Sequence, residues 1–255
     1  RDEKGLFFIE GLKFVREALE EKAGIVSLFV SEQFAGLSSG KAFLVQIENN
    51  NLRIAEPAGI YILPAKLFNE ISDTETPQGV LAVIKMKNHE LKREMQKDGL
   101  YVALESVQDP GNMGTIIRTA DAAGFSGVII FKGCVDIYNP KVLRSTMGSI
   151  FHLPIFLCDC PLETLEMLKA SGIRLYASHL KGTVNYYEVN IKKKAAVIIG
   201  NESKGISEEA ASLADALVKI PMIGMAESLN ASVAAGLLMY ESVRQRMFST
   251  LNDSF

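Results

Sequence analysis

The sequence predicts an α/β protein in two parts, a compact αβ module followed by a parallel sheet with helices on both faces. Apolar residues make up 48% of the 255 positions, enough for a substantial core. In the second half, continuous apolar strands alternate with segments of helical spacing, which is typical of a parallel sheet. Between the halves, the stretch KMKNHELKREMQKDG at 85–99 has few apolar residues and indicates a linker.

The first part begins with an apolar strand and a helix whose apolar residues at 12, 15, 18 and 19 share one face. Three further apolar runs predict strands, whereas 36–59 holds scattered Gly, Asn and Pro and predicts no clear element. The predicted elements are strands at 6–9, 25–30, 60–63 and 79–86 and a helix at 11–22. We expect a smaller domain at 1–88 and a linker at 89–98.

The second part, 99–255, has the more regular pattern. Its predicted strands are 100–104, 128–131, 153–157, 174–178, 195–200 and 216–220, and its predicted helices begin at Met113 and cover 140–150, 162–171, 208–214 and 231–247. Ligands of open parallel sheets bind at the carboxyl ends of the strands. The loops that follow three of these strands are therefore candidates for chemistry: SVQDPGNMG at 106–114, GNESKGIS at 200–207 and IPMIGMAESLNAS at 220–232.

Composition restricts the location and the partners. The longest apolar runs, such as VIIF at 128–131, are far shorter than the about 18 residues of a membrane span, and no signal peptide opens the chain. Cys134, Cys158 and Cys160 lack the ligand pairs of a zinc site and fit reduced thiols. We therefore expect a cytoplasmic protein with no membrane association and no metal. The net charge of −3 gives no global attraction to nucleic acid, so RNA would need a local basic patch such as KKK at 192–194.

The common catalytic motifs are missing. The sequence has no G-x-G-x-x-G after a strand, no G-x-x-x-x-G-K-[ST], no G-x-S-x-G and no histidine pair at metal spacing. With three histidines in the chain, a histidine triad or a metal site is not expected. Ordinary dinucleotide enzymes, phosphate-loop NTPases and serine hydrolases thus lack their usual evidence.

The three loops instead carry polar residues close to helix N-termini. Asn112, Ser228 and Asn230 could each cap a helix, and a helix dipole could stabilise Glu202, so each has a structural interpretation. Arg118 differs, because it lies among apolar residues of its predicted helix, where a guanidinium needs acceptors. A structural salt bridge or a clamp on a phosphate would satisfy it.

The three loops belong to longer segments, LESVQDPGNMGTIIRTADAAGF, VIIGNESKGIS and IPMIGMAESLNASVAAGLLMYE, with LRSTMGSIFHLPIF between the first two. In order and spacing they resemble the three motifs of the SpoU (TrmH-type) ribose 2′-O-methyltransferases of the SPOUT superfamily, over about 98–247. The first part, with GLFFIEGLKFVREAL and ISDTETPQGVLAVI, is similar to the L30e-like substrate-binding domain that many such enzymes carry. Relatives usually have further basic residues before RDEKG, so a short arm is expected to precede this sequence.

The resemblance implies an α/β-knot fold in which a deep trefoil knot binds S-adenosyl-L-methionine. It also implies a homodimer whose active sites use residues of both subunits. Carried over position by position, the catalytic residues are Asn112, Arg118, Glu202, Ser228 and Asn230. The residues expected to bind the cofactor are Ser178, His179, Leu180, Gly200, Asn201, Ile220, Met222 and Leu229.

The activity that the resemblance implies is methylation of a ribose 2′-hydroxyl of RNA by an S-adenosyl-L-methionine-dependent enzyme. The expected substrate is 23S ribosomal RNA, and transfer RNA is the alternative. Family mechanisms make Arg118 the base that removes the hydroxyl proton, whereas a protonated Arg118 bound to the adjacent phosphate is physically easier. Two alternatives outside catalysis are an RNA- or ribosome-binding protein that keeps the fold and, with less support, a small-molecule-binding αβ regulator.

Overall fold

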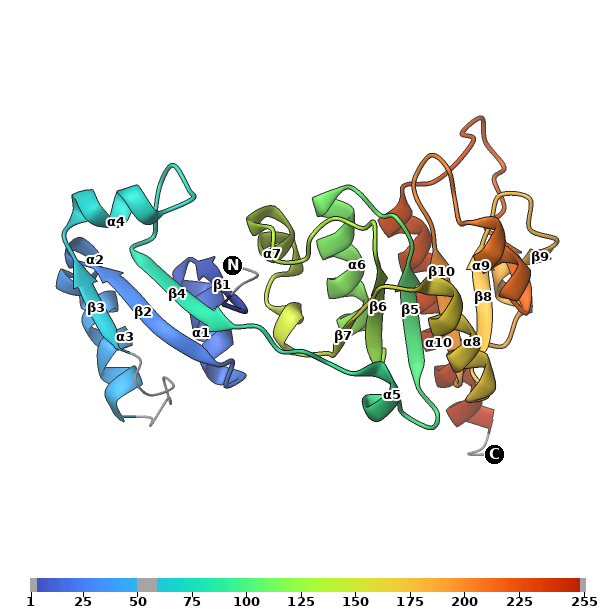
Figure 1. Cartoon of the computed structure of the whole chain (residues 1–255), viewed down its shortest axis with the longest axis horizontal. Helices are drawn as coiled ribbons and strands as arrows, with labels where there is room; N and C mark the ends of the chain where they lie inside the picture. The colour runs from blue at the N-terminus through green and yellow to red at the C-terminus, as the bar shows by residue number, and fades with distance from the viewer. Residues whose placement is uncertain (1–3, 50–58, 253–255) are drawn as a thin grey trace. The chain divides into compact units, whose positions relative to one another are not determined.

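The structure is a computed structural model that describes residues 4–49 and 59–252. The chain divides into two compact units, Arg1–Asn88 and His89–Phe255 (Figure 1). Each unit has its own sheet and is of the predicted α/β class. No helix of the described residues combines the length and the hydrophobicity of a membrane span.

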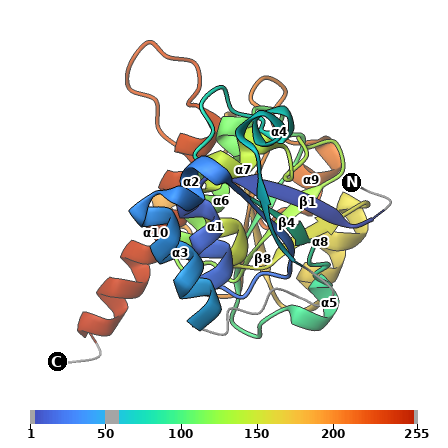
Figure 2. The ribbon, with the colours of Figure 1, turned by 90° about the vertical axis from the view of Figure 1, so that its left-hand side faces the viewer.

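The first unit is built on a four-stranded mixed sheet. Its elements are β1 (Leu6–Glu10), α1 (Leu12–Glu20), β2 (Ile25–Ser31), α2 (Glu32–Gly36), α3 (Ser38–Asn49), β3 (Ile60–Leu63), α4 (Ala65–Ile71) and β4 (Val80–Lys85). The strand order is β1-β4-β2-β3, with β4 antiparallel to both neighbours and β3 parallel to β2. Helices α1 and α3 lie side by side on this sheet (Figure 2), and the guanidinium of Arg16 lies 5.7 Å from the ring centroid of Phe43.

Helix α3 occupies most of the described part of the region for which the sequence predicts no element. It forms because Phe43 and Ile47, four residues apart, share a buried face. Gly40 disfavours a helix by its intrinsic propensity. The fold requires it nonetheless, since a Cβ at this position would lie 1.8 Å from the carbonyl oxygen of Phe34.

The second unit contains seven parallel strands. In chain order its elements are α5 (Leu91–Glu94), β5 (Leu100–Leu104), α6 (Pro110–Ala122), β6 (Gly127–Phe131), α7 (Pro140–Thr146), β7 (Ile155–Cys158), α8 (Pro161–Ala170), β8 (Arg174–Ser178), β9 (Val184–Asn185), β10 (Ala195–Ile199), α9 (Glu208–Leu213), β11 (Ala216–Lys219) and α10 (Ala231–Asn252). The strand order is β7-β6-β5-β10-β8-β11-β9, and all neighbouring strands are parallel. The six predicted strands of this part are all present, and the short β9 is an addition.

Both faces of this sheet are covered. Val102 and Leu104 of β5 join a core with residues of α6 and α10, whereas Tyr101 and Ala103 join a second core with residues of α5 and α8. Successive side chains of a strand point to opposite faces, so the uninterrupted apolar strands reflect burial on both sides.

Helix α6 begins at Pro110, three residues before the predicted start. Asp109 is its N-cap, because a side-chain oxygen of Asp109 accepts a hydrogen bond of 2.7 Å from the backbone N–H of Asn112. Proline is tolerated in the first turn of a helix, where its missing N–H would have no intrahelical partner. Asn112 therefore lies inside the helix, and the interpretation of Asn112 as a cap is wrong.

The segment 89–98, expected as a linker, packs on the second unit. Leu91 of α5 is buried in the core that contains Tyr101. The backbone N–H of Gln96 donates a hydrogen bond of 2.8 Å to the hydroxyl of Tyr101. Buried Leu91, partly buried Met95 and this hydrogen bond together attach a segment that is otherwise polar.

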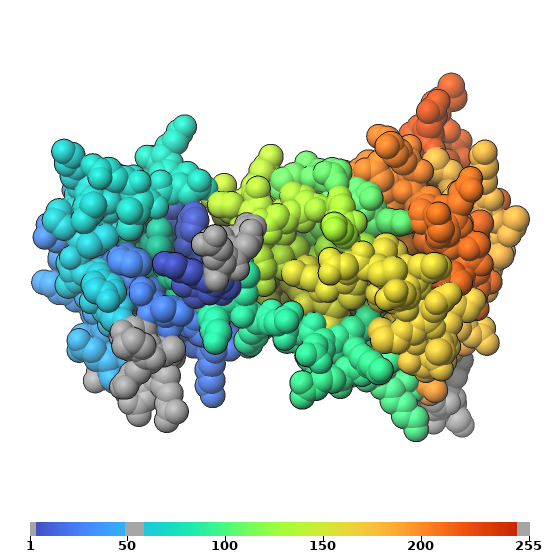
Figure 3. Space-filling model, viewed as in Figure 1, coloured from blue at the N-terminus to red at the C-terminus, as the bar shows by residue number. Residues whose placement is uncertain are grey.

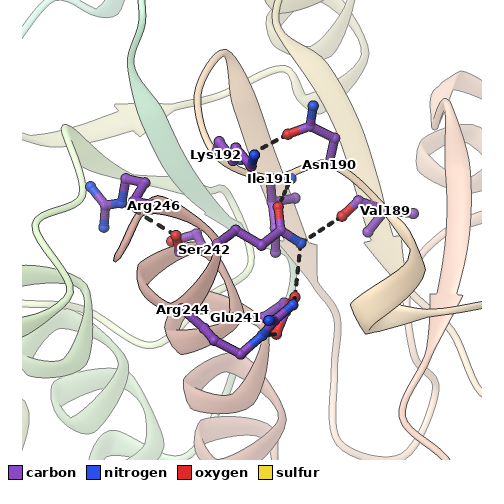
Figure 4. A network of polar contacts seen from close by, with 9 residues as sticks. Val189, Asn190, Ile191, Lys192, Glu241, Ser242, Arg244 and Arg246 are labelled. Atoms are coloured by element: carbon purple, nitrogen blue, oxygen red, sulfur yellow. Dashed lines mark hydrogen bonds and ion pairs between the residues drawn. The ribbon is translucent and has the colours of Figure 1, made fainter. Parts of the chain in front are cut away.

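The second half of α10 is fixed to the segment between β9 and β10 by a polar network (Figure 4). Nε2 of Gln245 donates hydrogen bonds of 2.8 Å to the carbonyl of Val189 and to Glu241, and its Oε1 accepts one of 3.0 Å from the N–H of Ile191. Arg244 donates two more to Glu241, at 2.6 and 2.7 Å. Burial alone would raise the pKa of Glu241, but these hydrogen bonds lower it below its ordinary value. The carboxylate thus stays charged and keeps the network intact.

Candidate active site

Three loops meet at the carboxyl ends of the neighbouring strands β10, β8 and β11 and line a pocket of about 350 Å³. This volume lies within the range of small-molecule sites. The position agrees with the rule that open parallel sheets bind ligands beyond the carboxyl ends of their strands. Two of the three loops selected from the sequence, 200–207 and 220–232, contribute to the lining, and the third contributor is the loop after β8.

All eight residues expected to bind a cofactor line this pocket: Ser178, His179, Leu180, Gly200, Asn201, Ile220, Met222 and Leu229. Glu202 and Ser228 of the expected catalytic set line it as well. The sequence did not single out the remaining lining residues, Lys181, Ile199, Ser203, Lys204, Gly205, Ala231 and Ala234. The sequence feature that could have identified them is their position near the predicted residues in the chain.

The pocket wall after β10 is a tight hairpin, residues 201–205. The backbone N–H and C=O groups of Asn201 and Gly205 exchange two hydrogen bonds of 2.9 Å. The side-chain oxygen of Asn201 accepts two more, of 3.0 Å each, from the N–H groups of Ser203 and Lys204. Gly200 permits this fold, because a Cβ there would lie 2.2 Å from the carbonyl carbon of Gly205.

A chain of side-chain hydrogen bonds connects the three loops that the sequence selected. Nδ2 of Asn112 donates to a carboxylate oxygen of Glu202 at 2.8 Å. Oδ1 of Asn112 accepts from Nδ2 of Asn230 at 2.9 Å. Asn112 is 8% exposed, whereas Glu202 and Asn230 are exposed. These hydrogen bonds therefore fix the orientations of a carboxylate and an amide that face the solvent side of the site.

Asn230 also caps α10. Its Oδ1 accepts hydrogen bonds from the N–H groups of Ser232 and Val233, at 2.9 and 3.3 Å, which confirms the capping interpretation for this residue. Ser228, two residues earlier, is exposed on the pocket and has no hydrogen-bond partner within the described part of the chain. Its hydroxyl is thus available to a ligand.

Arg118 lies on the exposed face of α6, so the expectation that apolar neighbours surround it is wrong. Thr115 and Ala122, three residues before and four after it, are exposed on the same face. Arg118 comes six positions after Asn112, which corresponds to about 240° around a helix, so the two side chains point in different directions. Within residues 4–49 and 59–252, Arg118 has no hydrogen bond or ion pair, and it does not line the pocket.

The loop between β11 and α10 stands out from the second unit (Figure 3). Met222, Ser228 and Leu229 of this loop line the pocket, whereas Ile223 and Met225 are 99% and 100% exposed. The loop thus connects the pocket wall to a projecting apolar tip.

The described residues hold no group of three or more His, Cys, Asp or Glu side chains that could bind a metal ion. Cys134 and Cys158 are free and half-buried, and burial raises the pKa of both thiols. For Cys134, the charges of Glu105 and Glu202 act in the same direction.

Comparisons with known proteins give the family. Residues 99–240 match the SpoU rRNA Methylase family, and residues 1–82 match the MRM3-like substrate binding domain. The chain is 35% identical over 240 residues to the 23S rRNA (guanosine(2553)-2′-O)-methyltransferase RlmP of Bacillus subtilis, covering 94% of this chain and 89% of that protein. It is 32% identical over 253 residues to the 23S rRNA (uridine(2479)-2′-O)-methyltransferase of Streptomyces viridochromogenes, covering 97% and 85%. The chain belongs to the SpoU rRNA methylase family.

Solved structures agree with this assignment over both units. The SpoU methyltransferase AviRb from Streptomyces viridochromogenes, in complex with the cofactor AdoMet, superimposes with a TM-score of 0.85 at 31% identity, covering 97% of this chain and 92% of that chain. The AdoMet-bound rRNA methyltransferase from Sinorhizobium meliloti gives 0.84 at 34% identity, covering 96% and 89%. The family resemblance and the fold class inferred from the sequence are confirmed.

Proposed function

We propose that this protein transfers a methyl group from S-adenosyl-L-methionine to a ribose 2′-hydroxyl of 23S ribosomal RNA. The observation that carries the proposal is the pocket beyond β8, β10 and β11 with the hydrogen-bonded chain Glu202–Asn112–Asn230 beside it. Two relatives named as 23S rRNA 2′-O-methyltransferases match 94% and 97% of the chain. The A. aeolicus TrmH/SpoU tRNA modifying enzyme covers 63% of it, with a TM-score of 0.54, so ribosomal RNA is favoured over transfer RNA.

The residues of the pocket fit S-adenosyl-L-methionine. Ile220, Met222 and Leu229 offer apolar surface to a nucleobase, and the polar groups of His179 and of the hairpin 201–205 suit a ribose and an amino acid. When bound, this group supplies the methyl carbon as an electrophile. We infer that the eight residues expected from the sequence hold it.

We propose that Asn112, Glu202, Ser228 and Asn230 orient the target nucleotide. In-line methyl transfer needs the hydroxyl oxygen aligned behind the methyl carbon, and such orientation can supply about 7–11 kcal/mol of barrier reduction. The mutual hydrogen bonds of Glu202, Asn112 and Asn230 restrict their side chains before the RNA binds. The free hydroxyl of Ser228 adds a donor and acceptor beside the pocket.

We propose that Arg118 binds the phosphate next to the target ribose and lowers the pKa of the hydroxyl, whose proton passes to solvent water as the oxygen takes the methyl group. Its exposure supports this role over that of a base, since a guanidinium stays protonated in proteins and its planar fork suits phosphate. Arg118 does not line the pocket of its own chain. We therefore infer that it serves the pocket of a second copy, in a homodimer.

An exposed apolar stripe on α10 supports the homodimer. Val233, Leu237 and Tyr240 recur at helical spacing and are at least 38% exposed, and α10 packs against α6, the helix of Arg118. Exposed apolar stripes of this kind commonly mark interaction surfaces. In a two-fold symmetric dimer the same surface meets itself, which would carry each Arg118 to the partner.

Glutamates at positions 233 and 240 are expected to separate the dimer. Val233→Glu/Tyr240→Glu places four buried carboxylates in the interface, so light scattering should give the mass of one chain and methylation should be lost. Leu162→Glu, on the exposed face of α8, is the control and should leave both the mass and the activity unchanged. A wild-type protein that is already monomeric and active would contradict the proposal.

We propose that the first unit, 1–88, binds the RNA and that the protein acts in the cytoplasm. The match to the MRM3-like substrate binding domain supports the first statement. The bacterial relatives that act on 23S rRNA support the second.

Two measurements test the function. Mass spectrometric mapping of 23S rRNA from cells with and without the gene should show one ribose that loses 14 mass units. Titration calorimetry should show that the purified protein binds S-adenosyl-L-methionine. Binding without any change in 23S rRNA, but with a change in transfer RNA, would favour the alternative substrate, and absence of binding would leave a non-catalytic RNA-binding protein.

A further inference from the structure

Glu105 is a buried carboxylate outside the site described so far. It follows the apolar strand β5 and is 9% exposed, although carboxylates are seldom buried without a partner. Its Oε2 accepts a hydrogen bond of 2.8 Å from the backbone N–H of Ser207, and its own N–H donates one of 2.9 Å to the carbonyl of Ile199. Ser207 and Ile199 flank the hairpin 201–205 that forms the pocket wall.

A second contact fixes the same hairpin from the same loop. Nδ2 of Asn201 donates a hydrogen bond of 2.9 Å to the carbonyl of Ser106, whose φ of 56° lies in the left-handed region. Residues other than glycine keep this conformation where their surroundings hold it. Together with the hydrogen bond from Asn112 to Glu202, three contacts hold the hairpin: two at its first two residues, Asn201 and Glu202, and one at Ser207, two residues past its end.

We propose that Glu105 is a positioning residue that holds the hairpin 201–205 where Glu202 meets Asn112 and where the pocket wall is complete. Glu105 does not line the pocket, so it acts through the hairpin. A hydrogen bond from an N–H to a carboxylate is stronger than one to a neutral acceptor. Movement of the hairpin away from Glu105 would leave a buried charge without its donor, which opposes the movement. The inference rests on the proposed function, because its test uses S-adenosyl-L-methionine.

Ser207 offers a matched pair of variants. Its φ of −67° is a value that proline adopts, so Ser207→Pro removes the N–H that Glu105 accepts. It also removes the hydroxyl that caps α9 by accepting from the N–H of Ala210. Ser207→Ala removes the hydroxyl and keeps the N–H. In calorimetry, we expect Ser207→Ala to bind S-adenosyl-L-methionine as the wild type does and Ser207→Pro to bind about tenfold more weakly.

Variants of Glu105 complete the test. Glu105→Ala is expected to lower the affinity for S-adenosyl-L-methionine by about the same tenfold. The double variant Glu105→Ala/Ser207→Pro should bind no more weakly than either single variant, because both substitutions break the same hydrogen bond. Glu105→Gln should restore most of the affinity, since its amide oxygen can still accept from Ser207. If Glu105→Ala does not fold, the Ser207 pair decides alone. Equal affinities of Ser207→Ala and Ser207→Pro would overturn this inference, whereas a wild-type protein that does not bind S-adenosyl-L-methionine would contradict the proposed function instead.

Discussion

Arg118→Ala is expected to lower the rate of methyl transfer about 100- to 1,000-fold, the usual effect of removing one hydrogen-bond donor that stabilises a transition state. The affinity for S-adenosyl-L-methionine should stay within a few-fold of the wild type, because Arg118 does not line the pocket of its own chain. Single-turnover transfer to a 23S rRNA fragment measures the rate, and calorimetry measures the affinity. The split between the two quantities separates a role at the RNA from a role at the cofactor.

Two further substitutions make this result specific. Arg118→Lys keeps the positive charge but loses the planar fork, so we expect an intermediate rate. Arg174→Ala removes another exposed arginine, which lies at the amino end of β8. The pocket lies at the opposite, carboxyl end of this strand. Its rate should equal that of the wild type. Near-normal turnover of Arg118→Ala would make Arg118 a surface residue without a part in the chemistry.

Mixed dimers test whether Arg118 acts across the subunits. A chain with Arg118→Ala keeps its pocket, and a chain with Leu229→Glu keeps Arg118 but has a charged group in its pocket. If Arg118 serves the partner, a dimer of these two chains has one complete site, and an equal mixture should regain about a quarter of the wild-type activity. If Arg118 served its own chain, no mixture would regain activity.

The four strands of the first unit, six of the seven strands of the second unit and the location of the candidate pocket were predictable because each leaves a local pattern, whereas helices α2, α3 and α4 were not predicted. Uninterrupted apolar strands indicate burial on both faces. In the strand order of the second unit, β8, β10 and β11 are neighbours, so residues 178, 200 and 220 lie together at the carboxyl ends of these strands. The polar residues of the three motif loops stood at helix N-termini and strand ends, where side chains converge. The polar residues of the loops and the pattern of the strands thus indicated the same end of the sheet, the carboxyl ends of its strands.

The environment of Arg118 was not predictable from the composition of its helix. Alanine and threonine fit either an exposed or a buried face, so the run around Arg118 looked apolar although Thr115, Arg118 and Ala122 share the exposed face. The buried side of α6 carries Asn112, Met113, Ile116, Ile117 and Ala120, and the packing of this set decides which face points inward. Whether a helical residue is buried or exposed therefore has to be predicted from its angle around the helix axis rather than from its neighbours in sequence.

The contacts that shape the pocket wall leave no periodic signal. Glu105 looks like the polar end of an apolar strand, and its hydrogen bond to Ser207 depends on a turn more than 90 residues later. Gly200 looks like a glycine that lets the backbone approach a ligand. Its neighbour in space is the backbone of Gly205, a contact that only the closed hairpin creates.

Gly200→Ala is consequently expected to weaken the binding of S-adenosyl-L-methionine about 100-fold. The added Cβ would lie 2.2 and 2.3 Å from the carbonyl carbon and oxygen of Gly205 and 2.4 Å from the backbone nitrogen of Ile206. Backbone atoms cannot rotate away as the end of a side chain can, so the hairpin has to move. The residues that line the pocket from 201 to 205 move with it, and the hydrogen bond from Asn112 to Glu202 is lost.

Gly224→Ala provides the matched control on the loop at the other side of the pocket. A Cβ at Gly224 would meet nothing within 4 Å, and this residue is not among those with positive φ, so calorimetry should give the wild-type affinity. The unfolding midpoints of both variants should show that the second unit still folds, because the hairpin lies at the surface and outside both cores. An unchanged affinity of a folded Gly200→Ala would mean that this wall does not border the cofactor. The pocket beyond β10 would then lose its role, whatever the result for Arg118, because the two substitutions act on separate parts of the reaction.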